Sequence, residues 1–101
     1  MREAYVYIMS NKSHRLYIGS TTDLIRRARQ HKAGTYPNSF TARYNYDRLV
    51  FYEVMESYAS AIRRERYLKG LIRSKKVAMI QKENPKWRDL SIHFEDLLMA
   101  R

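Results

Sequence analysis

The first 20 residues alternate between apolar runs and polar breaks in a way that predicts a β-hairpin. Residues 4–9 (AYVYIM) are mostly aromatic, β-branched or aliphatic, and both alternating faces of this run are apolar. Such a strand is typical of the centre of a sheet that is covered on both sides. The polar residues 11–14 (NKSH) predict a turn, and residues 15–20 (RLYIGS) predict the return strand.

Helical periodicity follows the hairpin. Thr21 or Thr22 can cap a helix over about 22–33, and Asp23 in its first turn suits the helix dipole. Gly34 predicts the end of this helix. Residues 35–47 (TYPNSFTARYNYD) have no period, and a loop of this length in a small domain is usually functional.

The second half of the chain predicts one strand and two helices. Residues 48–55 (RLVFYEVM) predict the third strand, and Ser57 predicts the cap of a helix over about 58–72 that is interrupted near Gly70. Ser74 predicts the start of a helix over 75–83, which stops before Pro85. A short amphipathic run over 92–99 follows.

The order of these elements, ββαβαα, predicts an α+β fold in which helices flank a small, three-stranded, mainly antiparallel sheet. A chain of 101 residues predicts a single domain, 1–101, with its core over about 4–90. No apolar stretch approaches the roughly 20 residues of a membrane span, so we expect no membrane partner. The absence of cysteine excludes disulfides and thiolate metal sites, and it fits the reducing cytoplasm, where we expect the protein to act.

The charge balance indicates a polyanionic partner. Twenty Lys and Arg against ten Asp and Glu give a net charge of +10. Such an excess on a small domain favours DNA, RNA or an acidic membrane surface, and the interleaving of basic residues with nine tyrosines favours nucleic acid. The plainer alternative is a well-solvated surface that happens to be basic.

The helix predicted over 22–33 carries the first candidate site. At about 100° per residue, Leu24 and Ala28 define its inner stripe, and Arg27 and His31 lie within roughly 60° of Leu24. A guanidinium beside an imidazole at the edge of a core is suited to hold a phosphate and to move a proton. The alternative is an arginine that lies over the core and a histidine that is satisfied at its edge.

The helix predicted over 58–72 carries a carboxylate in an unusual place. Glu65 falls in the middle of the apolar arc of this helix, where a carboxylate is rare unless it is paired or binds a metal. Lys69 lies one turn further on and is a candidate partner, so a salt bridge at the edge of the core is one interpretation. A magnesium-binding carboxylate that faces the hairpin is the other.

The tyrosines of the hairpin add to this picture. Tyr5 and Tyr7 share one face of the first strand, and Tyr17 stands on the second strand with Gly19 two residues further on. A glycine here leaves room for the close approach of a backbone or ligand. A phenol has a pKa near 10, so it needs a nearby cation or metal to act as a base. Paired tyrosines on a hairpin are also common core residues.

The order of these motifs resembles the GIY-YIG nuclease superfamily. The matching features are YVY at 5–7, YIG at 17–19, Arg27 and His31 on the next helix, RRERYLKG at 63–70 and NPKWRDL at 84–90. The resemblance is closest to the small single-domain branch, which is similar to the nuclease part of the bacterial excision-repair nuclease. Tyr5 stands where that family has its first glycine, but the tyrosine position is kept as Tyr7.

The resemblance implies a metal-dependent endonuclease that hydrolyses DNA in repair, recombination or processing. Tyr7 and Tyr17 would orient or deprotonate the attacking water, and which of them is the base stays open. Arg27 would hold the scissile phosphate, and His31 would assist proton transfer. Glu65 would bind the one divalent cation, Mg²⁺ or Mn²⁺. The remaining implied catalytic residue, matched by position, is Asn84.

Further basic and aromatic residues are candidates for contact with DNA. They are exposed on the first helix, follow it in the loop, or stand beside Glu65: Arg26, Arg29, Lys32, Tyr36, Arg43, Tyr44, Tyr46, Arg48 and Lys69. The alternation of rings and guanidiniums over 35–48 predicts a preference for single-stranded or branched DNA over duplex, because rings stack only on exposed bases. The alternative is that Phe40 and some of these tyrosines anchor the loop to the core. A non-catalytic basic DNA- or RNA-binding module is the rival function.

Overall fold

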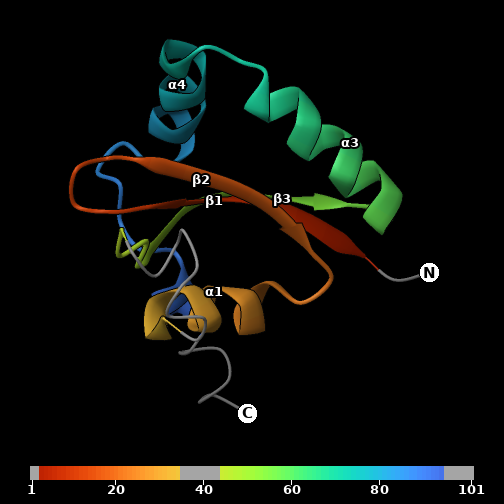
Figure 1. The fold of residues 1–101 in the computed structure, drawn as a ribbon, viewed down its shortest axis with the longest axis horizontal. Coiled ribbons are helices and arrows are strands. Elements are labelled where there is room, and N and C mark those ends of the chain that lie inside the picture. The colour runs from red at the N-terminus through yellow and green to blue at the C-terminus, as the bar shows by residue number, and fades with distance from the viewer. Residues whose placement is uncertain (1–2, 35–43, 95–101) are drawn as a thin grey trace.

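A computed structural model describes residues 3–34 and 44–94. Strands β1 (Ala4–Ser10) and β2 (Leu16–Thr21) form the hairpin, and helix α1 (Leu24–Ala33) follows it. Strand β3 (Arg48–Met55) and helices α3 (Tyr58–Lys69) and α4 (Arg73–Glu83) complete the order. This order confirms the predicted ββαβαα succession and the α+β class (Figure 1).

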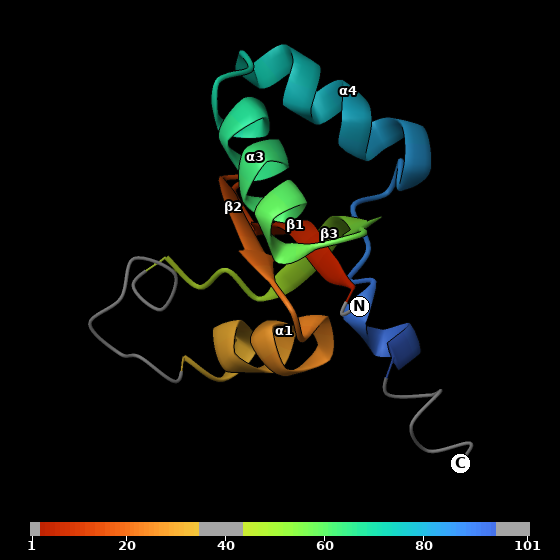
Figure 2. The ribbon, with the colours of Figure 1, turned by 90° about the vertical axis from the view of Figure 1, so that its right-hand side faces the viewer.

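The sheet is three-stranded and antiparallel, with strand order β2-β1-β3. Helix α1 lies against one face of the sheet, and α3 and α4 lie on the opposite side (Figure 2). The central strand β1 is covered on both faces, as its doubly apolar pattern predicts. Among the described residues, no helix has both the length and the apolar character that crossing a bilayer requires.

The two faces of the sheet bury two separate clusters. Val6 and Ile8 of β1 pack with Leu68 of α3 and Ile80 of α4 on one face. On the other face, a cluster rich in tyrosine packs against Leu24 of α1. Because side chains alternate along a strand, Tyr7 and Met9 point to the face that α1 covers.

The helix ends differ in part from the sequence prediction. Helix α1 is capped by Asp23, whose carboxylate accepts from the Arg26 amide at 3.1 Å, and not by Thr21 or Thr22. The Thr21 hydroxyl instead accepts from the Asp23 amide at 3.0 Å, which positions the capping residue. The left-handed backbone of Gly34, with φ of 61°, ends the helix as predicted.

The boundary between α3 and α4 also differs from the prediction. Ser57 caps α3 as expected, accepting from the Ser60 amide at 3.1 Å, but α3 ends at Lys69 and not near residue 72. The prediction that Ser74 opens α4 is wrong, because the helix begins at Arg73. The carbonyl of Ile72 already accepts from the amides of residues 75 and 76, so the first turn closes there without a side-chain cap.

Gly19 permits the closest contact on the α1 face of the hairpin. It stands opposite Tyr7 in the β1–β2 register, and the Tyr7 ring lies over it. A Cβ atom at position 19 would lie 2.5 Å from the Tyr7 hydroxyl oxygen and 2.7 Å from the adjoining ring carbon. No side chain fits there while Tyr7 keeps its place, so the register and the position of Tyr7 require glycine at 19.

We predict that Gly19→Ala moves the Tyr7 ring and lowers the free energy of unfolding by about 1–3 kcal/mol, the usual cost of forcing extra volume into a packed site. Gly70→Ala is the matched control, because a Cβ there would lie 3.4 Å from the Tyr67 carbonyl oxygen, an ordinary contact, and the backbone is right-handed. Urea denaturation of both variants measures the difference. Equal stability of the two variants would contradict the packing of Tyr7 over Gly19.

Candidate active site

A buried pair of Tyr7 and His31 forms the centre of the site. The Tyr7 hydroxyl oxygen lies 3.0 Å from His31 Nε2, which joins β1 to α1 across 24 residues of sequence. Tyr7 is 1% exposed and His31 is 9% exposed. Tyr17 adds a third ring, with its centroid 5.1 Å from that of His31 and 6.4 Å from that of Tyr7. The structure therefore brings three of the predicted catalytic residues together.

The surroundings of this pair keep both groups neutral at pH 7. Burial raises the pKa of Tyr7 well above its usual 10, and the neighbouring Tyr17 and Glu65 act in the same direction. The Arg27 guanidinium opposes this, both by its charge and by a hydrogen bond to Tyr7. Burial, with the charge of Arg27, lowers the pKa of His31 to about 4. A neutral imidazole therefore faces a protonated phenol, the state in which Nε2 can accept the phenol proton.

Helix α1 positions its basic residues as the helical period predicts. Arg27 is half-buried beside Tyr7, whereas Arg26 and Arg29 are exposed. This difference follows from the stripe of Leu24 and Ala28, which turns the Arg27 side of the helix towards the sheet. One guanidinium therefore lies at the phenol, and two lie on the outer surface, where they are free to meet a phosphate backbone.

Glu65 approaches the site from the opposite face of the sheet, past the edge strand β2. Its Oε1 accepts a hydrogen bond of 2.6 Å from the Ser20 hydroxyl, and its Oε2 lies 2.6 Å from the Lys69 ammonium. Burial acts to raise the pKa of Glu65, but the hydrogen bonds from Lys69 and Ser20 outweigh it and hold the pKa below its usual value. The predicted salt bridge is therefore present, and the carboxylate is ionised at pH 7.

A single divalent cation fits this carboxylate, with solvent and substrate supplying the other ligands. The described residues contain no group of three or more histidine or acidic side chains that could enclose a metal, so a fully protein-made cage is not available among them. Glu65 is ionised and its side chain is 19% exposed, which leaves it accessible. One carboxylate with water and phosphate oxygens is a usual environment for Mg²⁺. The Lys69 ammonium has to leave Oε2 before an ion can coordinate there.

The structure divides the predicted DNA-binding residues into several groups. Lys32 is tied to Asp89 at 2.7 Å and to the Ser91 hydroxyl at 3.2 Å, and Lys69 is tied to Glu65. Tyr44 and Arg48 are half-buried. Tyr46, another predicted DNA contact, is 1% exposed in the tyrosine-rich core and offers no ring face to a base in this structure. Tyr36 and Arg43, with Phe40, lie outside the described residues.

Asn84 holds backbone groups of its neighbours in place. It ends α4, and its amide nitrogen donates to the carbonyls of Val50 at 3.2 Å and Arg88 at 2.8 Å. Its side-chain oxygen accepts from the Arg88 amide at 3.0 Å. Both donor hydrogens and the oxygen are thus used to fix the segment after α4 against β3. We therefore leave Asn84 out of the catalytic group that we propose below.

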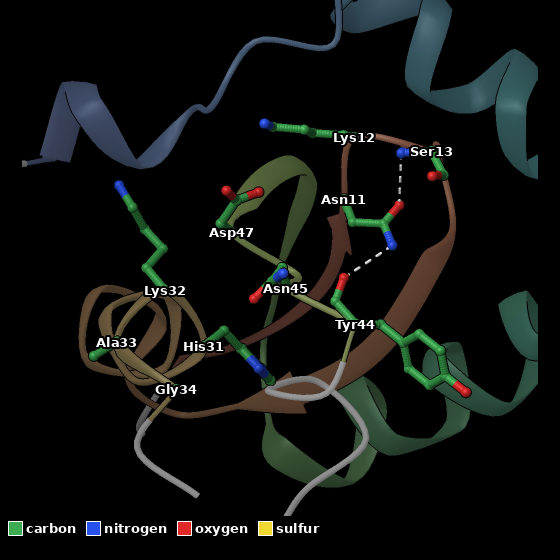
Figure 3. A pocket seen from close by; sticks show the side chains of 10 residues that line it. All are labelled: Asn11, Lys12, Ser13, His31, Lys32, Ala33, Gly34, Tyr44, Asn45 and Asp47. Carbon is green, nitrogen blue, oxygen red and sulfur yellow. Dashed lines mark hydrogen bonds between the residues drawn. The ribbon is translucent and has the colours of Figure 1, made fainter. Parts of the chain in front are cut away.

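A pocket of about 480 Å³ opens beside His31. Its walls come from the β1–β2 turn, the C-terminal end of α1 and the segment before β3, and Lys12 and Lys32 contribute its basic side chains (Figure 3). Asn11 joins two of these walls by donating to the Tyr44 carbonyl at 2.9 Å. His31 thus has Tyr7 on one side and a pocket of nucleotide size on the other.

Ser20 is a site residue that the sequence analysis did not identify. It follows directly after Gly19, so it points to the opposite face of β2, where α3 brings Glu65. A signal existed in the sequence, because alternation along the strand places residue 20 on the face away from Tyr7. What the sequence could not show is that α3 crosses this strand at that point.

Protonation of His31 should destabilise the fold between about pH 6.5 and pH 4. The folded protein holds His31 with a pKa of about 4, whereas the unfolded chain restores the ordinary value of 6.5. Within this window the unfolded state binds the extra proton, so the free energy of unfolding falls as the pH falls, and the loss is complete below about pH 4.

Urea denaturation of the wild type and of His31→Gln, near pH 7 and near pH 4.5, measures this effect. The wild type should lose more stability than the variant over this interval, because the other titrating groups are common to both proteins. Equal losses would show that His31 is not held neutral by its surroundings.

Comparisons with known proteins identify the family of the chain. A model of the GIY-YIG catalytic domain family matches residues 3–78, a range that includes Tyr7, Tyr17, Arg27, His31 and Glu65. The UPF0213 protein of Syntrophus aciditrophicus is 32% identical over 85 residues, which cover 84% of this chain and 97% of that protein. The UPF0213 protein of Haloquadratum walsbyi is 38% identical over 76 residues, which cover 71% of this chain and 80% of that protein.

A solved structure is also similar. The solution NMR structure of the UPF0213 protein from Bacillus halodurans matches with a TM-score of 0.54 and 31% sequence identity, covering 86% of this chain and 92% of that chain. The family match extends over three strands and both helices that carry the candidate site. The chain therefore belongs to the GIY-YIG catalytic domain family, whose members form a nuclease superfamily.

Proposed function

We propose that this protein is a divalent-metal-dependent endonuclease that hydrolyses phosphodiester bonds of DNA. The observation that carries this proposal is the buried contact of 3.0 Å between the Tyr7 hydroxyl and His31 Nε2, with Arg27 beside it. A phenol and an imidazole in contact can move a proton, and a guanidinium can hold a phosphate. An ionised carboxylate at the neighbouring strand edge supplies the place for a cation.

We assign Tyr7 as the group that accepts a proton from the attacking water, and His31 as the group that accepts the hydroxyl proton of Tyr7. As the phenol oxygen takes a proton from the attacking water, it passes its own proton to Nε2 of the neutral imidazole, and His31 releases that proton to solvent after the phosphodiester bond is cut. Burial disfavours the phenolate, so this step depends on nearby positive charge, which Arg27 supplies in part. Tyr17 is half-buried beside both groups, where it can orient the water.

Arg27 and Glu65 divide the work of stabilising charge. Arg27 is the residue that we assign to the scissile phosphate, because its guanidinium already lies at the Tyr7 hydroxyl. Glu65 would hold the Mg²⁺ or Mn²⁺ ion, and Ser20 fixes the orientation of its carboxylate. When bound, the ion stabilises the negative charge that develops on the leaving oxygen.

Single-stranded or branched DNA is the substrate class that we favour. The pocket beside His31 is large enough for an unpaired nucleotide, and it carries Lys12 for a phosphate, with Lys32 beside it paired to Asp89. A duplex keeps its bases stacked inside and offers mainly its backbone to the protein. An unpaired nucleotide next to the scissile phosphate can enter this pocket, and such a substrate is in keeping with the role in DNA repair, recombination or processing that we propose.

One observation favours the rival function, a non-catalytic basic module that binds DNA or RNA. Lys69 neutralises Glu65 through a contact of 2.6 Å, and a carboxylate paired in this way needs no metal. The buried contact between the phenol and the imidazole favours the enzyme instead, because it joins a proton donor to a proton acceptor beside Arg27. A cleavage assay decides between the two functions.

The protein should nick DNA in the presence of Mg²⁺, cutting single-stranded and branched substrates faster than duplex. Glu65→Gln should abolish cleavage while keeping the fold and DNA binding, because it removes the charge that holds the ion and keeps the shape of the side chain. Gel assays on the three substrates, with circular dichroism of the variant, measure these outcomes. Cleavage by Glu65→Gln at the wild-type rate would refute the role of this carboxylate.

Arg27→Ala should reduce the cleavage rate by about 10²–10³, the scale of losing one preorganised donor that stabilises charge. Arg29→Ala is the matched control, because this side chain is exposed two residues away on the same helix. Single-turnover rates at saturating DNA separate loss of chemistry from loss of binding. If both variants cut equally well, the inward position of Arg27 has no catalytic meaning.

A further inference from the structure

The ion pair of Lys69 with Glu65 occupies the place where the proposed function requires a cation. The ammonium nitrogen lies 2.6 Å from Oε2, and the second oxygen is taken by Ser20 at 2.6 Å. Both carboxylate oxygens therefore have a partner, and one of these partners is itself a cation. A metal ion that coordinates Oε2 has to displace the ammonium, because the two positive charges repel each other at this distance.

We propose that Lys69 is a built-in competitor for the divalent cation at Glu65, and that a phosphate of the bound substrate draws it away. This inference rests on the proposed function. It assigns Lys69 a role in regulating the metal site, so that cation and DNA bind with positive coupling. The free protein then holds the ion weakly, and the complex with DNA holds it tightly.

The exposure of the two partners supports this exchange. The Lys69 side chain is 54% exposed, whereas the Glu65 side chain is only 19% exposed. An exposed lysine stem reorients freely, and an exposed ion pair one helical turn apart is weak. The inner partner stays in place, because the Ser20 hydroxyl holds Oε1 after the ammonium has moved.

The neighbourhood of Lys69 supports a phosphate as its second partner. Arg66 stands one turn before it and is exposed, and the charge of Arg66 reaches Glu65, where it contributes to the lowered pKa. Lys69 and Arg66 thus present two cations to solvent beside the carboxylate. We expect a DNA strand whose scissile phosphate lies at Arg27 and Glu65 to place a neighbouring phosphate near this pair, because phosphates follow one another closely along the backbone.

The coupling has to be reciprocal. If a phosphate removes the competitor and so tightens cation binding, then the bound cation tightens DNA binding by the same factor. Deletion of the ammonium removes the competition, so the cation should then bind more tightly without DNA. The remaining effect of DNA should become smaller, since only its own phosphate oxygens still help to bind the ion.

Titration of Mn²⁺ by calorimetry tests the inference without any measurement of cleavage. Lys69→Met keeps the length of the side chain and removes its charge, and it should bind Mn²⁺ about twofold more tightly than the wild type, the scale of one ion pair between residues four apart on a helix. Lys75→Met removes an exposed lysine of α4 and should leave the affinity unchanged. Glu65→Gln should lose the binding event.

A second titration includes a single-stranded phosphorothioate oligonucleotide, which keeps the backbone charge and resists hydrolysis. It should increase Mn²⁺ affinity in the wild type more than in Lys69→Met. Equal gains in the two proteins, or an unchanged affinity of Lys69→Met for Mn²⁺ alone, would overturn the inference. If the inference fails in this way but Glu65→Gln still loses Mn²⁺ binding, the metal site of the proposed function stands. No Mn²⁺ binding by any of these proteins would overturn both.

Discussion

The approach of the Tyr7 ring to Gly19 is the contact on which the candidate site depends. A Cβ atom at position 19 would lie 2.5 Å from the phenol oxygen, so the ring reaches its place only because β2 has no side chain there. This position puts the hydroxyl 3.0 Å from His31 Nε2 and within reach of Arg27. The requirement for glycine in the YIG tripeptide is therefore steric, and it determines where Tyr7 of the neighbouring strand β1 can lie.

The edge position of β2 explains how groups from both faces of the sheet form one site. Tyr7 of β1 meets His31 of α1 on the face that α1 covers, and Glu65 comes from α3 on the other face. A central strand would keep these groups apart, because a further strand would pair along its side. Ser20 marks the crossing point, since it stands next to Gly19 and binds the Glu65 carboxylate.

Local sequence signals placed the elements well and their ends less well. The order of strands and helices, the bounds of β3 and the caps at Ser57 and Gly34 follow from periodicity and residue type. The start of α4 does not, because the Ile72 carbonyl closes its first turn although Ser74 is the better capping residue. Several oxygens near a helix start compete for the same amides, and only the folded backbone decides among them.

For the site, the sequence by itself determined which side chains are present and which face of each element they share. Alternation along β1 placed Tyr5 and Tyr7 on one face of the strand, and the helical period of α1 placed Arg27 and His31 on the inner side of that helix. Only the packing of α1 on the Tyr7 face brought these groups together. The spacing of four residues on one helix had already suggested Lys69 as a partner for Glu65. Tertiary structure alone decided that His31 lies neutral at Tyr7 with a pKa of about 4, that Tyr46 is buried, and that Ser20 meets the Glu65 carboxylate. Burial and contact between elements set these properties, and they depend on how helices pack across the sheet, which no local pattern records.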